Sequence, residues 1–182
     1  MKNLLLILLT FISLTAFSQA KLTTTSGHIK FFSSTPAEDI EANNYKVISN
    51  LTPTTGAIVF SVPMQSFEFE KALMQKHYNS SKFLDTKKFP KSKFNGTISN
   101  MADIDLSTDG SNEAKVTGEL TIHGVTKKIQ ENLQLTVSNG KVTGQTSFDI
   151  ALADYGVVFA KGKASTNIAK TVKATVNLDF NK

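Results

Sequence analysis

Three histidines, His28, His77 and His123, are the side chains of this chain best suited to hold a metal ion. Three histidines can bind zinc and leave a fourth position for water. They fall on different predicted elements, however, and no two are two or four residues apart. His123 follows an alternating strand and falls on its polar face. We interpret it as a surface or strand-end histidine held by a local hydrogen bond. A metal protein or enzyme that depends on His123 or His77 is the less favoured alternative.

Other chemistry has little support in the sequence. Asp103 and Asp105 share the face of a predicted strand, but they offer too few oxygen ligands for a calcium site. The chain has no cysteine, which excludes thiol redox chemistry and cysteine-bound metals. We find no G-x-S-x-G turn and no glycine-rich phosphate loop. The sequence therefore predicts no catalytic residue, no metal site and no cofactor.

The first residues, "MKNLLLILLTFISLTAFSQAK", have the pattern of an exported protein. One lysine precedes an apolar run and then small residues, as in a secretory signal peptide. We predict a signal peptide over residues 1–18, with cleavage after Ala20 as the alternative, and one domain over residues 19–182. Without a cysteine there is no thiol-linked lipid anchor. We expect the mature protein to be periplasmic or secreted.

The formal net charge is +5, and every basic residue is lysine. Arginine is the preferred side chain for phosphate and base-edge recognition, so we expect no nucleic-acid partner. Scattered lysines allow transient contact with an anionic membrane surface. A homodimer is neither indicated nor excluded.

The second half alternates apolar and polar residues as β-strands do. Val116, Gly118, Leu120 and Ile122 share one face. Ile129, Leu133, Leu135 and Val137 share another, where Glu131 breaks the apolar register. "SNGK" predicts a hairpin turn at Asn139-Gly140, because a type I′ turn needs positive φ at both central residues. The return strand and the C-terminal strand "TVKATVNLDFNK" repeat the pattern.

The first half is less regular. "SGHIKFFSST" and "YKVISNLTPTTGAIVFSVPMQSF" indicate strands with a turn at residues 53–56, and Pro63 indicates a strand end. "FEFEKALMQKHY" predicts the helix, with Phe69, Leu73 and either Lys76 or His77 along one face. "GTISNMADIDLSTDGSNEAKV" is predicted to return to strand. About eight long strands joined by short turns predict an all-β fold, an extended eight-stranded antiparallel lipocalin-like β-barrel with one short helix.

The apolar inventory is distinctive, with 13 Phe and no Trp. Phe31 and Phe32 are consecutive and must point to opposite faces of a strand. Other phenylalanines cluster around the predicted helix and the irregular segment after it. They either plug one end of the barrel or line the mouth of an apolar channel. Gly118, Gly144 and Ala174 are small inward residues that could leave space in the bore.

Three ordered motifs resemble the YceI-like family. They are "VTGELTIHGVTKKI", "HYNSSKFLDTKKFPKSKFNG" and "FDIALADYGV". The chain departs from the family pattern at "FFSSTP", where a histidine is frequent, and in "EKALMQKH", where an Arg-Asp pair is usual. The resemblance implies a lipocalin-like barrel with a helix beside it. It also implies an exported, non-catalytic carrier of a polyisoprenoid or another long-chain amphiphilic lipid.

We expect the lipid ligand to contact apolar side chains of the bore and its mouth. These candidate lipid-binding residues are Phe32, Phe60, Phe69, Leu73, Phe83, Phe89, Leu120, Ile122, Leu133, Phe148 and Val176. The face patterns do not distinguish a hollow bore from a filled one. A ligand-free barrel acting as an exported stress or interaction protein therefore stays open as an alternative.

Overall fold

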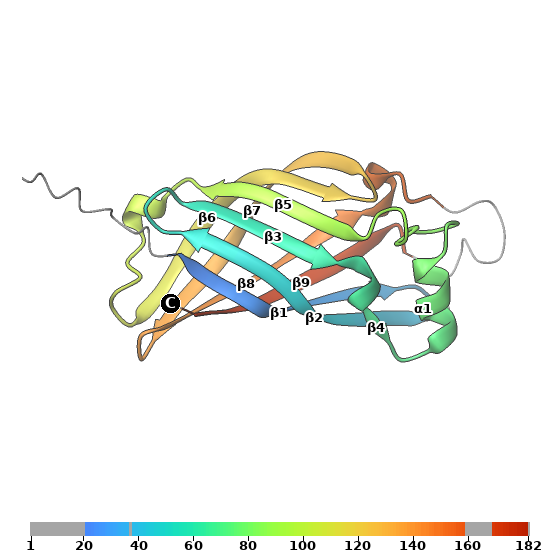
Figure 1. Cartoon of the computed structure of the whole chain (residues 1–182), viewed down its shortest axis with the longest axis horizontal. Helices are drawn as coiled ribbons and strands as arrows, with labels where there is room; N and C mark the ends of the chain where they lie inside the picture. Colours follow the sequence, from blue (N-terminus) through green and yellow to red (C-terminus); the bar gives the residue numbers. More distant parts are fainter. Residues whose placement is uncertain (1–20, 37, 159–168, 182) are drawn as a thin grey trace, which may run out of the picture.

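The computed structural model describes residues 21–36, 38–158 and 169–181 (Figure 1). The predicted signal peptide lies outside these residues. In the described part, no helix is both long and apolar enough to cross a membrane. The elements are, in chain order, β1 (Leu22–Ser34), β2 (Asp39–Thr52), β3 (Ala57–Pro63), η1 (Met64–Ser66), β4 (Glu68–Phe69), α1 (Ala72–Asn79), β5 (Lys91–Ile98), η2 (Met101–Asp103), β6 (Gly110–Ile122), β7 (Val125–Ser138), β8 (Lys141–Ala151), η3 (Leu152–Tyr155) and β9 (Thr171–Phe180).

The long strands form one closed antiparallel barrel. Its strand order is β1-β9-β8-β7-β6-β5-β3-β2, and pairing of β2 with β1 closes the sheet. The short β4 extends β2 at one end through the pairs Ala42–Phe69 and Asn43–Glu68. The prediction of an eight-stranded antiparallel barrel with one short helix is confirmed. Because the barrel is closed, the alternation of residues along each strand produces an inner apolar face and an outer polar face.

Two hairpin turns carry positive backbone φ angles at both central residues. The predicted Asn139-Gly140 turn is confirmed, with φ of 51° and 74°. His123 and Gly124 form the second turn, with φ of 51° and 79°, between the paired residues Ile122 and Val125. His123 therefore lies in the β6–β7 turn. The prediction that it falls on the polar face of a strand is wrong.

The helix begins later than predicted. Glu68 and Phe69 pair with β2 as β4, so α1 starts only at Ala72. Tertiary strand pairing overrides the helix propensity of this segment. Asp103 ends the short helix η2, and Asp105 lies in the loop after it. The prediction that these two aspartates share a strand face is therefore wrong.

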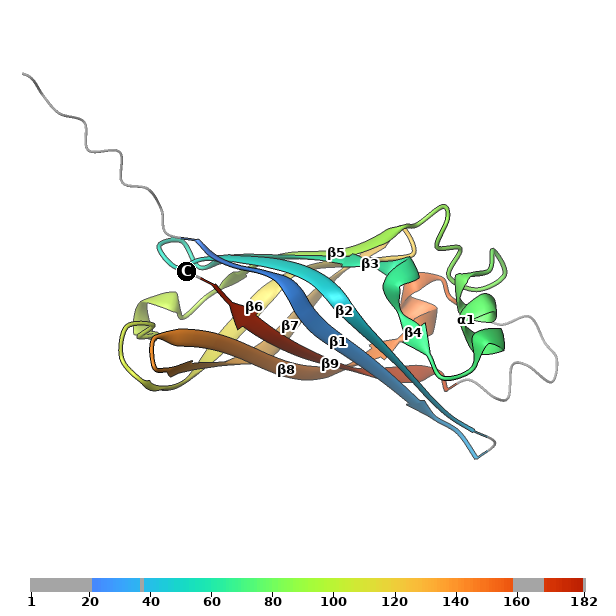
Figure 2. The same cartoon turned by 60° about the horizontal axis from the view of Figure 1, so that its bottom comes forward.

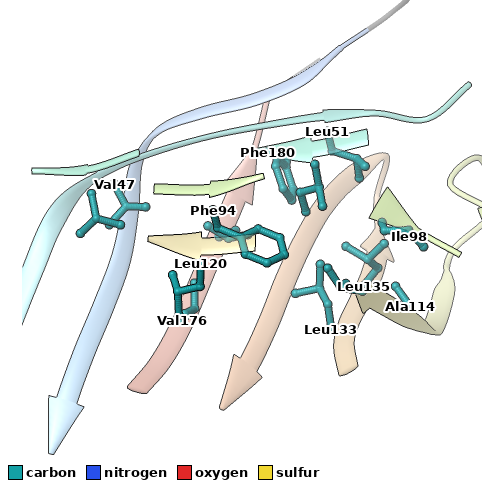
Figure 3. Packing of buried hydrophobic residues seen from close by; sticks show 14 of the residues in the cluster. Val47, Leu51, Phe94, Ile98, Ala114, Leu120, Leu133, Leu135, Val176 and Phe180 are labelled. Atoms are coloured by element: carbon teal, nitrogen blue, oxygen red, sulfur yellow. The ribbon is translucent and has the colours of Figure 1, made fainter. Parts of the chain in front are cut away.

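The two ends of the barrel differ (Figures 1 and 2). The end near the C-terminus is tightly packed, and Leu51, Ile58, Ile98, Leu135 and Leu178 are 0–2% exposed there. Figure 3 shows Leu51, Ile98 and Leu135 within this packing. At the end near α1, Tyr78 packs with four phenylalanine rings: Phe31, Phe67, Phe69 and Phe83. Phe31 also contacts Phe67 and Phe69 directly. Aromatic rings thus plug the barrel beside the helix, while aliphatic side chains fill the opposite half.

Candidate functional site

An apolar cavity of about 90 Å³ lies inside the barrel between these two packed regions. Seven of the eight barrel strands contribute residues to it. The lining residues are Ile29, Ile58, Phe60, Val62, Ser92, Lys93, Phe94, Val116, Leu120, Ile129, Glu131, Asn132, Leu133, Thr146, Phe148 and Val176. Ligand pockets of proteins usually measure about 300–1,000 Å³. The cavity therefore suits part of an apolar chain, and a longer chain needs side chains to move.

Phe94 limits the size of this cavity. Its ring lies over the paired glycines Gly96 and Gly118 and meets the ring of Phe60 edge-on, with centroids 5.9 Å apart. Gly144 is less crowded, but a Cβ there would still lie 3.3 Å from Leu178 Cδ1. The small residues Gly118 and Gly144 therefore leave no free bore space. Because these glycines have no side chain, neighbouring side chains fill the space beside them.

Five of the eleven candidate lipid-binding residues line the cavity together. They are Phe60, Leu120, Leu133, Phe148 and Val176. Phe69, Phe83 and Ile122 are partly buried and pack against the apolar core. The ring of Phe89 stands edge-on to His123 outside the cavity, with centroids 4.5 Å apart. The sequence pattern thus placed most of the candidates within one continuous apolar interior.

Two candidates lie on the outer surface instead. Phe32 is 37% exposed, because its neighbour Phe31 takes the inward position and packs on Phe67. Leu73 is 63% exposed, because α1 turns Tyr78 toward the barrel. Periodicity places consecutive residues on opposite faces without saying which face is inside.

The site prediction omitted several residues that the structure brings to the cavity. Ile29, Phe94 and Ile129 line it from β1, β5 and β7. For Ile129 the signal was available, since it shares the predicted register of Leu133. Phe94 follows an irregular segment, and its role depends on two glycines of different strands. Only the pairing of β5 with β6 reveals that packing.

The barrel is closed between β7 and β8 by a short ladder only. Their ladder comprises only the pairs from Gln134–Gln145 to Ser138–Lys141, next to the hairpin turn. By contrast, β7 stays paired with β6 from Val125 onward, and β8 stays paired with β9 up to Ala151. Thr146 Oγ1 donates a hydrogen bond to the carbonyl oxygen of Asn132, 2.6 Å away. Residues 125–133 of β7 and 146–151 of β8 have no ladder pairs with each other. We call this region the β7–β8 split.

Glu131 lies in the β7–β8 split on the inward face of β7. Its cross-strand partner is the buried Val116, and directly paired residues share a face. Burial raises the pKa of the Glu131 carboxyl, and the nearby carboxylate of Asp149 adds to the increase. The residue that broke the apolar register in the sequence is therefore an acidic group at an apolar cavity.

The three histidines lie on different elements: His28 in β1, His77 in α1 and His123 in the β6–β7 turn. His28 bonds Asn43 through Nε2, at 2.8 Å, and stacks on Tyr45 outside the barrel. His123 Nδ1 lies 3.3 Å from the carbonyl oxygen of Tyr155, which ties the β6–β7 turn to η3. Among the described residues, no three histidine, aspartate or glutamate side chains gather as metal ligands would.

Asp105 has a local structural role in its loop. Its Oδ1 accepts hydrogen bonds from the backbone N–H and the hydroxyl of Ser107, at 2.7 and 2.6 Å. It also accepts one from the backbone N–H of Thr108. These bonds hold the pKa of Asp105 well below its usual range. The carboxylate is therefore engaged in forming a turn, as aspartates often are.

The fold and its interior define a class of protein, the closed antiparallel β-barrel with an apolar cavity in its bore. The profile of the YceI-like domain matches residues 10–181, and the chain belongs to this family. A UPF0312 protein of Shewanella baltica (strain OS185) is 29% identical over 125 residues, which are 64% of this chain and 60% of the relative. A UPF0312 protein of Pseudomonas putida (strain W619) is 36% identical over 77 residues, 42% of this chain and 36% of the relative. The matches thus span about 60% or less of the length of these relatives.

Solved structures share the fold at low identity. A polyisoprenoid binding domain from Saccharophagus degradans, implicated in plant cell wall breakdown, superposes with a TM-score of 0.74 at 16% identity. The match covers 90% of this chain and 98% of that domain. BcnA of Burkholderia cenocepacia gives a TM-score of 0.70 at 17% identity, over 86% of this chain and 96% of that one. These likenesses extend over nearly the whole barrel.

Proposed function

We propose that this protein is a non-catalytic carrier that holds the apolar chain of a polyisoprenoid or another long-chain amphiphile inside its barrel. The observation that carries the proposal is the apolar cavity between β3, β5, β6, β7 and β8, around Phe60, Leu120 and Phe148. The polyisoprenoid binding domain that shares the fold supports this ligand class. The N-terminal pattern supports an exported carrier, periplasmic or secreted.

The energetics of such binding are favourable. Enclosing apolar surface contributes about 25 cal/mol per Å². About 400 Å² of chain contact therefore contributes about 10 kcal/mol, which offsets most association costs in the range of about 4–15 kcal/mol. The chain would have to displace flexible side chains around the cavity, chiefly the rings of Phe60, Phe94 and Phe148. No metal, nucleophile or cofactor is needed for this function.

A filled barrel without a ligand is the second candidate. The small cavity volume and the Phe94 ring over Gly118 favour it. Such a protein would act through its outer surface, as an exported interaction or stress protein. The two candidates differ in whether purified protein carries a lipid.

Native mass spectrometry of the purified mature protein, followed by organic extraction, tests the proposal. We expect a stoichiometric long-chain mass that remains bound in the native protein and is lost on denaturation. Extraction that yields no stoichiometric lipid, together with no uptake of added long-chain alcohols, would favour the filled barrel. Bound zinc that is lost in His123→Ala would instead support the histidine-dependent alternative.

A further inference from the structure

The β7–β8 split is a stretch of the barrel wall in which two neighbouring strands do not continue their hydrogen-bonded ladder. Six residues of β8, from Thr146 to Ala151, lack ladder partners on β7, a length of roughly 20 Å at the usual rise of a strand. The split is bounded by the hairpin ladder at one end. At the other end η3 is tied to the β6–β7 turn through His123 and Tyr155. Asn132, Thr146 and Phe148 line the cavity from the two sides of the split.

Glu131 is the acidic group that lies in this split and lines the cavity. Continuing the register of the β7–β8 ladder would place it opposite Phe148, and both residues line the cavity. Among the described residues, Glu131 forms no ion pair and no side-chain hydrogen bond. Two lysines are candidate partners: Lys127, the nearest same-face cation on its own strand, and Lys93, which lines the cavity from β5. Both are exposed, and neither forms a salt bridge with Glu131 in the described part of the chain. Its hydrogen-bonding capacity is therefore available to a ligand.

A second carboxylate reinforces the charge of the split. Asp149 on β8 is close enough to raise the pKa of Glu131. Lys173 lies opposite Asp149 on β9, but the two form no salt bridge in the described part of the chain. A ligand carboxylate or phosphate in the split would therefore be repelled by two like charges. A hydroxyl or ammonium group would instead donate a hydrogen bond to Glu131.

We propose that the polar end of the ligand lies in the β7–β8 split beside Glu131, and that this residue selects amphiphiles ending in a hydrogen-bond donor over those ending in an anion. The inference rests on the proposed carrier function. It names the ligand class as long-chain alcohols or amines. It also places the polar end at the side of the barrel instead of at the aromatic plug beside α1.

Competition binding tests the inference on delipidated full-length mature protein. The neutral fluorescent probe N-phenylnaphthylamine is displaced with hexadecanol, hexadecylamine or hexadecanoic acid, which share one chain length. We expect the alcohol and the amine to bind at least about tenfold more tightly than the acid at neutral pH, because only the acid is repelled. In Glu131→Gln the disadvantage of the acid should shrink to about twofold or less.

Glu119→Gln is the matched control, since Glu119 is exposed on the outer face of β6 and the substitution removes the same charge. It should keep the preference of the wild-type protein. Equal binding of acid and alcohol by the wild-type protein overturns the inference and leaves the carrier function standing. An unchanged preference in a folded Glu131→Gln variant also overturns it. Failure of all three ligands and of the probe to bind overturns the carrier function itself.

Discussion

The ring of Phe94 occupies the space that a side chain at Gly118 would need. A Cβ placed on Gly118 would lie 2.6 Å from Phe94 Cζ, and the paired Gly96 leaves the same opening on β5. Figure 3 shows Phe94 and Leu120 pointing into the same interior as Val176. A phenylalanine ring resting on two glycines therefore forms one wall of the cavity and sets its width.

Gly118→Ala should destabilise the barrel. The new methyl group would also collide with the backbone of Asn95 and Gly96, which cannot move without disturbing the β5–β6 ladder. We expect a loss of roughly 1–3 kcal/mol in the free energy of unfolding, as for other overpacked cores, measured by urea denaturation. Gly110→Ala is the control, because a Cβ there meets nothing within 4 Å. Equal stability of the two variants would contradict the packing of Phe94 on Gly118.

Leu120→Trp should block lipid uptake while the fold survives. Leu120 is 9% exposed and lines the cavity, so the larger indole would occupy the space a ligand chain needs. We expect bound lipid to fall severalfold at a stability cost of about 1–3 kcal/mol, measured by extraction and by thermal unfolding. Leu73→Trp introduces the same side chain at a position that is 63% exposed, and its lipid content should match the wild type. Unchanged lipid stoichiometry in a folded Leu120→Trp variant would show that the ligand binds elsewhere.

Tyr78→Phe should improve stability at alkaline pH. Burial raises the pKa of the Tyr78 phenol well above its usual range. The unfolded chain therefore ionises first, and stability is fully present below about pH 10 and falls as the pH rises further. The wild-type protein should lose up to about 1.4 kcal/mol per pH unit there through this group, and the variant should not. Thermal unfolding at several alkaline pH values measures the difference, with the exposed Tyr45→Phe as control.

Glu131→Gln should raise the melting temperature at neutral pH. The pKa of Glu131 is raised in the folded protein by burial and then by Asp149, so the ionised form costs stability. That cost is absent below the pKa of an unfolded glutamate, about 4.3, and grows as the pH rises through the folded pKa. The two proteins should melt together in acid and separate toward neutrality. A constant difference across the pH range, or a less stable variant at neutral pH, would contradict the partly buried position of Glu131 at the apolar cavity.

Much of the barrel could be predicted from the sequence, because strand alternation and hairpin turns depend on residues that are neighbours in the chain. Alternation of apolar and polar residues decided which residues of β6, β7 and β9 share a face. Positive φ at Asn139 and Gly140 followed from the dipeptide itself. The family resemblance rested on three short motifs, and the profile match over residues 10–181 agrees with it.

The rest depended on contacts between distant residues. Phe31 and Phe32 were known to face opposite ways, but only the packing on Phe67 showed that Phe31 is inside. The helix start moved because β4 pairs with β2, a contact that no local propensity describes. The cavity width depends on Phe94 meeting two glycines of paired strands.

The sequence by itself determined the all-β barrel, its hairpin turns and the apolar face of each strand, since strand periodicity is a property of neighbouring residues. Only the tertiary structure decided how full the bore is and where the ladder between two of its strands ends. The β7–β8 split leaves no trace in the alternation of either strand, because pairing between strands is a relation between distant segments. In the sequence, Glu131 only interrupts the apolar pattern of β7. In the structure it is the acidic group that lies in the split and lines the cavity.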